Sequence, residues 1–167
     1  MNKKWGIIAG VAVLILGIIV ILLIVFSGNK TLKGQDVNVS LNCYSSLEYK
    51  EIQGKSMKTA EITNKNEDFI FSIKIDTETL GYLYRNSFEK YKEDKQNSED
   101  ITINNITGFK YYDESTDQYQ IVFPVNEEET ILITIEPMVK GEGTTAKDIY
   151  NMKEVQDILE SIKIDKK

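Results

Sequence analysis

The chain offers few side chains that could do chemistry. It contains no histidine, which removes the most common general base and the usual metal ligand. Its single cysteine, Cys43, cannot form an intrachain disulfide, and a lone cysteine is more often a small buried residue than a reactive thiol. We therefore expect no catalytic residue, no metal site and no cofactor, and we predict that the protein is not an enzyme.

Two short motifs resemble parts of known sites. Residues 141–146 (GEGTTA) match the G-x-G-x-x-A pattern of dinucleotide-binding loops, but such a site also needs a parallel strand after the following helix and an acidic residue about 20 positions on, and we expect the chain to end before that unit is complete. Residues 87–90 (SFEK) match Ser-x-x-Lys, yet the companion S-D-N and K-T-G elements of penicillin-binding enzymes are absent. We interpret the first motif as a loop and the second as the packing face of a helix.

Carboxylates gather at residues 113–117 (DESTD) and 127–129 (EEE). A calcium loop needs oxygen ligands at alternate positions and a glycine at its sharp turn, and neither cluster has this pattern. Both are predicted to be solvated hairpin turns. A carboxylate-based enzyme would need two carboxylates facing each other across a cleft, and it is the least favoured alternative.

Tyrosine is frequent, with nine residues in the chain. Its ring is apolar and its tip is polar, which suits protein interfaces and sugar contacts. We predict that Tyr84, Tyr111 and Tyr119 contribute to an interaction surface. The alternative is that the tyrosines only line sheet edges and helix borders.

The elements that must position these residues follow a long apolar run, residues 6–26, in which no side chain is charged or polar. As a helix, its 21 residues would measure about 30 Å, the thickness of a bilayer's hydrocarbon core. We predict a transmembrane helix here. A cleaved secretory signal is the alternative, but its apolar region is usually only about 7–15 residues long.

The predicted domains follow from this helix. Residues 1–5 form a short cytoplasmic N-terminus, 27–36 a polar linker, and 37–167 one extracytoplasmic domain. Lys3 and Lys4 ahead of the run favour this orientation. The expected protein is therefore a single-pass, signal-anchored protein of the cell membrane, in contact with the lipid bilayer through residues 6–26.

Three glycines of the apolar run could bring two such helices together. Gly6 and Gly10 form a GxxxG motif, and Gly17 falls on nearly the same helix face. This spacing allows close helix approach and would support a weak homodimer.

The remainder of the chain is acidic. Beyond residue 26 it carries 18 basic and 26 acidic residues, a net charge of −8. This charge argues against binding to nucleic acid or to anionic lipid headgroups. Frequent lysine, isoleucine and asparagine with scarce alanine and proline are typical of an AT-rich bacterial genome.

Hydrophobic periodicity predicts an α+β domain in which an antiparallel sheet packs against two helices. Strands are expected at 44–49, 57–63, 69–76 and 101–106, with a meander at 108–137. The first helix is expected at 79–95. The second follows an Asn151–Glu154 capping box, and its apolar stripe comprises Met152, Val155, Ile158, Leu159 and Ile162.

This order of elements, with the ending EVQDILESIKI at 154–164, resembles the PsbP-like and DcrB-like proteins over residues 57–164. The resemblance implies an exported, membrane-tethered domain without enzymatic activity. It supplies no family motif whose functional residues could be transferred. Bacterial members are often lipoproteins, whereas this chain would use a helix as its tether.

Two functions are consistent with these observations. The favoured one is a non-enzymatic binding or accessory domain that meets a protein partner at the outer membrane surface. The alternative is a domain that captures a small ligand or substrate in a cleft lined by tyrosines.

Overall fold

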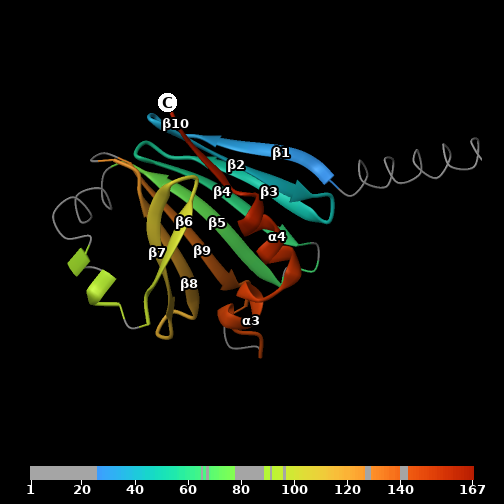
Figure 1. Cartoon of the computed structure of the whole chain (residues 1–167). Coiled ribbons are helices and arrows are strands. Elements are labelled where there is room, and N and C mark those ends of the chain that lie inside the picture. Colours follow the sequence, from blue (N-terminus) through green and yellow to red (C-terminus); the bar gives the residue numbers. More distant parts are fainter. Residues whose placement is uncertain are drawn as a thin grey trace, which may run out of the picture.

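In a computed structural model, the chain forms ten strands and two labelled helices in the described residues (Figure 1). Those residues are 26–64, 66, 68–77, 89–90, 92–95, 97–126, 129–139 and 143–167. The strands are β1 (Phe26–Lys33), β2 (Val37–Tyr44), β3 (Leu47–Gln53), β4 (Met57–Asn64), β5 (Phe69–Asp76), β6 (Glu99–Ile103), β7 (Ile106–Asp113), β8 (Gln118–Pro124), β9 (Thr130–Pro137) and β10 (Lys163–Lys166). The helices are α3 (Ala146–Tyr150) and α4 (Lys153–Ser161).

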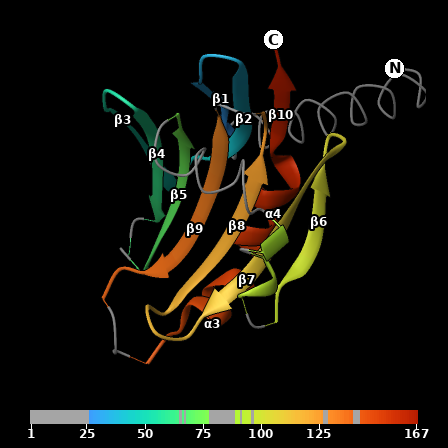
Figure 2. The ribbon, with the colours of Figure 1, turned by 90° about the vertical axis from the view of Figure 1, so that its left-hand side faces the viewer.

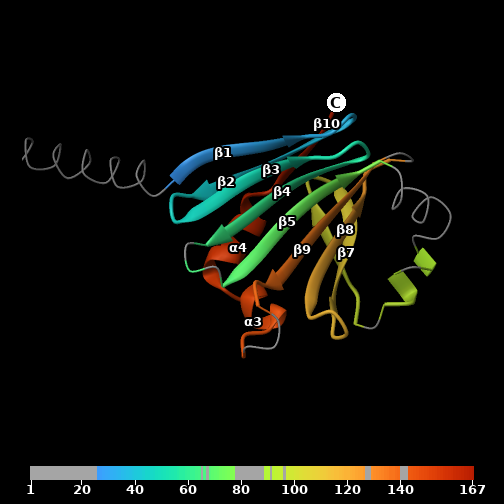
Figure 3. The same ribbon diagram turned by 180° about the vertical axis from the view of Figure 1, so that it is seen from behind.

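The strands build two antiparallel sheets. The larger has the order β3-β4-β5-β9-β8-β7-β6, and the smaller has the order β1-β2-β10. Figure 2 shows the large sheet in front of α3 and α4, with its strands side by side in this order. Seen from behind, β1 and β2 run across the same side of the molecule as β3 and β4 (Figure 3). The last strand, β10, lies beside β2 and brings the C-terminus next to the start of the domain.

The small sheet owes its position to β2. Every second side chain of this strand is buried, and these are Val37, Val39, Leu41 and Cys43. Such a period of two places one face of a strand on the core. β1 contributes Leu32 to the same core and pairs with β2 through a regular ladder from residue 29 onward.

The main core lies between the two sheets and the helices. It joins the small sheet to one face of the large sheet, including Phe71, Ile73 and Ile133, and to Val155 and Ile158 of α4. α3 packs on β8 and β9, and α4 packs on β2. A second, smaller cluster of Phe109, Tyr111 and Val122 is separate from this core. Because alternate residues of a strand point to opposite faces, it lies on the other face of the large sheet.

The expected fold class, α+β with one sheet on two helices, is wrong. Of the residues that the structure describes, 57% lie in strands and 15% in helices, and these strands form two sheets. The polar segment expected as a linker at 27–36 is largely strand β1 and belongs to the smaller sheet. The only large apolar residue of this segment is Leu32. The backbone hydrogen bonds to β2, rather than an apolar pattern of its own, therefore make it a strand.

The expected transmembrane helix is also corrected. Within the part of the chain that the structure describes, no helix is both long and apolar enough to cross a membrane. Of the predicted span at 6–26, only Phe26 is among the described residues, and it begins β1. The predicted helix contacts Gly6, Gly10 and Gly17 lie outside the described residues.

Several local predictions are confirmed. The strand at 69–76 is β5, and the meander at 108–137 is β7, β8 and β9 with antiparallel pairing. Cys43 is buried on β2, as a small apolar residue would be. In the closing helix, the apolar stripe of Val155, Ile158 and Leu159 faces the core. Most of the helix expected at 79–95 lies outside the described residues, although residues 89–90 and 92–93 are helical.

Other boundaries differ from the prediction. The strand expected at 44–49 straddles the turn between β2 and β3. The strand expected at 101–106 contains a two-residue turn at Asn104 and Asn105, whose φ angles of 49° and 64° suit asparagine.

The capping box lies one helix earlier than expected. Thr145 and Asp148 form it at the start of α3, whereas Asn151 is the C-cap of that helix. α4 instead begins after Met152, which makes no side-chain cap.

The acidic cluster at 127–129 was expected to be solvated, but Glu129 is only 1% exposed. Its carboxylate accepts hydrogen bonds from the backbone N–H groups of Gln35 at 2.5 Å and Asp36 at 2.8 Å. A Cβ on Gly34 would lie 2.7 Å from the Val37 carbonyl oxygen and 2.8 Å from Glu129 Oε1, so the β1–β2 turn needs glycine there. Glu129 therefore anchors the small sheet to the β8–β9 connection.

Candidate functional site

A cleft lies where β7 extends past the end of β6. β6 begins at Glu99, which pairs with Lys110, so Tyr111, Tyr112 and Asp113 continue β7 beyond it. The cleft has a volume of about 680 Å³. Its lining combines three tyrosines with charged and polar groups of both signs: Lys95, Asn97, Glu99, Tyr111, Tyr112, Asp113, Glu114, Ser115, Tyr119 and Lys147.

Strand geometry distributes the aromatic rings over both faces of the sheet. Tyr112 pairs with Tyr119 across β7 and β8, and their ring centroids lie 6.3 Å apart. Tyr119 in turn stacks on Tyr150 of α3 at 3.9 Å. Tyr111 points to the opposite face, where its hydroxyl donates to Gln120 Oε1 at 2.6 Å. The result is a row of three rings, Tyr112, Tyr119 and Tyr150, beside one wall of the cleft.

Lysine ammonium groups lie over several of these rings. Lys147 Nζ is 4.5 Å from the ring centroid of Tyr112, and Lys95 Nζ is 5.1 Å from that of Tyr111. Both distances are within the about 6 Å at which a cation is attracted to a ring face. Lys110 Nζ lies 5.4 Å from the centroid of Tyr150 and forms an ion pair with Glu99 at 3.0 Å.

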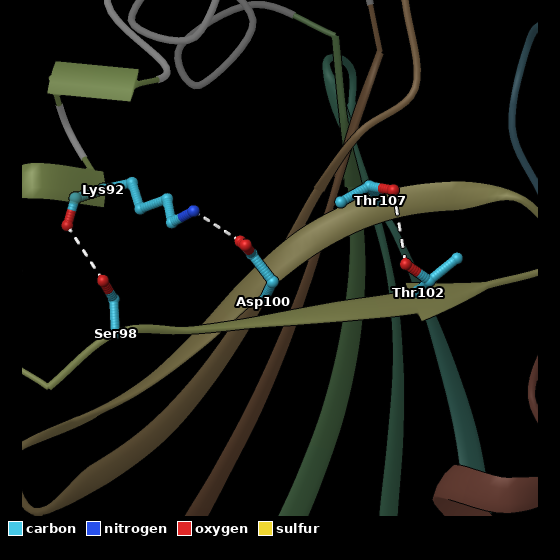
Figure 4. A network of polar contacts seen from close by, with 5 residues as sticks. All are labelled: Lys92, Ser98, Asp100, Thr102 and Thr107. Carbon is cyan, nitrogen blue, oxygen red and sulfur yellow. Dashed lines mark hydrogen bonds and ion pairs between the residues drawn. The ribbon is translucent and has the colours of Figure 1, made fainter.

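Lys95 follows a helical segment that is tied to β6 (Figure 4). Lys92 Nζ lies 2.5 Å from Asp100 Oδ1, and Ser98 Oγ donates to the Lys92 carbonyl at 3.2 Å. Farther along the same face of β6, the hydroxyls of Thr102 and Thr107 lie 3.3 Å apart and join it to β7. These contacts hold one wall of the cleft against the sheet.

Asp117 joins the β7–β8 turn to helix α3. Its Oδ1 accepts hydrogen bonds from the Tyr112 hydroxyl at 2.8 Å and from the Ala146 backbone N–H at 3.0 Å. The capping box of Thr145 and Asp148 then fixes the first turn of α3. Lys147 belongs to this turn, so the same contacts place its side chain beside Tyr112.

The ionisable groups in and beside the cleft have pKa values shifted in directions that suit binding rather than proton transfer. The hydrogen bond to Asp117 raises the pKa of Tyr112 to about 12. Hydrogen bonds from Ser115 lower the pKa of Asp113. Burial works against the charged form of Lys110, but its hydrogen bonds to Glu99 and Tyr150 leave its pKa raised. At neutral pH, Tyr112 is therefore neutral while Asp113 and Lys110 are charged.

The structure brings together two of the three tyrosines predicted for an interaction surface, since Tyr111 and Tyr119 line the same cleft. Tyr84 lies outside the described residues. Sequence reasoning missed the role of Tyr112, although its position opposite Tyr119 follows from a hairpin centred on 114–117. It also missed Tyr150 and Lys147, because nothing in the local pattern of α3 indicates which strand the helix covers.

The 141–146 motif and the acidic cluster at 113–117 lie partly or wholly within the described residues. In the 141–146 motif, Gly143 has a φ of 91° and Ala146 begins α3. Asp113 and Asp117 of the first acidic cluster bond to neighbouring donors of the turn and of α3. Across the described ranges, no group of three histidine, cysteine or acidic side chains converges as a metal site would.

Comparison of the chain with protein-family models, with curated proteins and with solved structures finds no match. The resemblance to the PsbP-like and DcrB-like proteins therefore stays a prediction.

Proposed function

We propose that the domain is a non-enzymatic binding module that captures a small ligand in the cleft beside β7. The observation that supports this most directly is the cleft itself. Its volume of about 680 Å³ is in the range of small-molecule sites. Three aromatic rings and seven charged or polar residues line it, so the cleft is more polar than most small-molecule sites and suits a polar or charged ligand.

The state of the lining groups supports binding without catalysis. A carboxyl group that acts as a general acid needs a raised pKa, whereas hydrogen bonding lowers that of Asp113. Glu99 is engaged in an ion pair with Lys110. The chain contains no histidine, and its one cysteine is fully buried on β2, away from this cleft.

We further propose that the domain works outside the cytoplasmic membrane, on the evidence of residues 6–26 and of the charges ahead of them. That run carries no charged side chain, and Lys3 and Lys4 precede it. Protease added to intact spheroplasts should then digest the domain, and protection of the domain until the cells are lysed would contradict this placement. A protein partner at the outer membrane surface stays a prediction.

Occlusion of the cleft tests the binding function. In the full-length chain in non-ionic micelles, Ser115→Trp would place an indole in the cleft from an exposed turn. Ser46→Trp, on the exposed turn between β2 and β3, is the matched control. The probes are choline, its neutral isostere 3,3-dimethylbutan-1-ol, maltose and citrate, each titrated by calorimetry.

The expected result is that at least one probe binds the wild type and Ser46→Trp with equal affinity and loses most of its affinity for Ser115→Trp. If no probe binds, or if a bound probe tolerates the filled cleft, the proposed function is wrong.

A further inference from the structure

We infer that the ligand carries an ammonium group, which takes the place of the Lys147 ammonium on the face of the Tyr112 ring. This inference rests on the proposed function and specifies the chemical class of its ligand. It follows from three observations: the position of Lys147, the charges around Tyr112, and the size of the cleft.

The ring of Tyr112 already carries a cation. Lys147 Nζ lies 4.5 Å from its centroid, the shortest of the lysine–tyrosine distances around the cleft. Among the described residues, no carboxylate lies within ion-pair distance of this ammonium. The cation–π contact with the face of the Tyr112 ring is therefore what holds the Lys147 side chain in the cleft.

The charges around the ring favour a cation as well. The Tyr112 hydroxyl donates to the Asp117 carboxylate, and Glu114 and Asp148 add negative potential at the same side chain. Asp113, one residue along β7, also lines the cleft and is ionised at neutral pH. A ring face beside several carboxylates attracts a cation through both its quadrupole and the surrounding potential.

Lys147 can give way at little cost. It is an exposed residue of the first turn of α3, and its long side chain can extend into water. The neighbouring ring of Tyr111 is a poorer site, because its side chain is only 3% exposed. Tyr119 has one face covered by Tyr150. Tyr112 is thus the ring at which a ligand ammonium can replace a residue of the protein.

The dimensions of the cleft point to a small amine rather than to a protein. Its volume of about 680 Å³ suits a molecule of drug size. The remaining lining groups, Asn97 and Ser115 among them, supply hydrogen-bonding partners for hydroxyl groups of the same ligand.

Lys147→Ala provides the sharpest test, because the variant should bind an ammonium ligand more tightly. An exposed cation–π contact is worth a factor of about two to five in affinity. Choline should therefore bind Lys147→Ala about two- to fivefold more tightly than the wild type, measured by calorimetry on the full-length chain in non-ionic micelles. The neutral isostere 3,3-dimethylbutan-1-ol should bind more weakly than choline, with little change between the two proteins.

Two further variants separate the ring from other effects. Tyr112→Phe keeps the ring and should retain choline binding, whereas Tyr112→Leu should weaken it at least threefold. Lys30→Ala removes the same charge from a similar pair, since Lys30 Nζ lies 5.7 Å from the ring centroid of Tyr49 outside the cleft. It should leave choline affinity unchanged. Near-ultraviolet circular dichroism verifies that each variant is folded.

The inference is overturned if Lys147→Ala binds choline no better than the wild type, or if the isostere binds as tightly as choline. If maltose or citrate binds in the cleft and choline does not, the ammonium class is wrong while the binding function stands. If none of the four probes binds, both proposals fall together.

Discussion

Replacing Glu129 with alanine should destabilise the protein more than replacing any of the charged residues that line the cleft. The side chain is 1% exposed, and its two oxygens accept the backbone N–H groups of Gln35 and Asp36. A hydrogen bond to a charged group contributes about 1.5–3 kcal/mol, and a buried donor left without a partner costs about 1–3 kcal/mol. Because Gln35 is exposed, water can replace part of the loss. We expect a decrease of about 3 kcal/mol in the free energy of unfolding.

Urea unfolding of the full-length chain in non-ionic micelles, followed by circular dichroism, measures this change. With a slope of about 2 kcal/mol/M, the midpoint should fall by about 1.5 M. Glu129→Gln keeps one acceptor oxygen but turns an amide donor toward a backbone donor, so it should lose at least half as much stability. A loss below about 1 kcal/mol for Glu129→Ala would refute the claim that this carboxylate anchors the small sheet.

Two further changes test the packing and the electrostatics of the cleft. Gly108→Ala should destabilise the protein by about 2–4 kcal/mol in the same urea assay, because a Cβ there would lie 2.1 Å from the Val122 carbonyl oxygen; a neutral effect would show that β7 and β8 are less closely paired. Tyr112 should titrate near its raised pKa of about 12 in ultraviolet absorbance, rather than near the usual 10.0, and Asp117→Asn should bring it back toward 10.0. Since the folded pKa is the higher one, this contribution to stability is fully present below pH 10.0 and is lost as the pH rises toward about 12. An unshifted Tyr112 would contradict the hydrogen bond to Asp117.

The sequence predicts strands well where one face of them is buried. Phe69, Phe71, Ile73 and Ile75 alternate along β5 and are fully or almost fully buried. The same signal was present in β2 at Val37, Val39 and Leu41, but the prediction began its first strand at Tyr44. β1 has no such signal, because its sequence is mostly polar. It becomes a strand through its backbone ladder with β2, which no local pattern in the sequence predicts.

The candidate site was predictable only in part, for a reason of topology. Nearness within a hairpin follows from sequence, so Tyr112 and Tyr119 could have been paired across the 114–117 turn. Nearness across the fold does not follow. Lys147 reaches the cleft, and Tyr150 stacks on Tyr119, because α3 packs on β8 and β9, and that packing depends on the whole core. The burial of Glu129 has the same origin, since its partners lie more than 90 positions away in sequence.

The most direct test of the binding function is to locate a bound ligand at the tyrosine rings. In the full-length chain labelled with ¹³C-tyrosine, choline should give intermolecular nuclear Overhauser effects between its N-methyl protons and the ring of Tyr112. These effects should be stronger in Lys147→Ala. If saturating choline shows contacts only to a tyrosine outside the cleft, such as Tyr49, or to no tyrosine at all, the assignment of the cleft as the ammonium-binding site is contradicted.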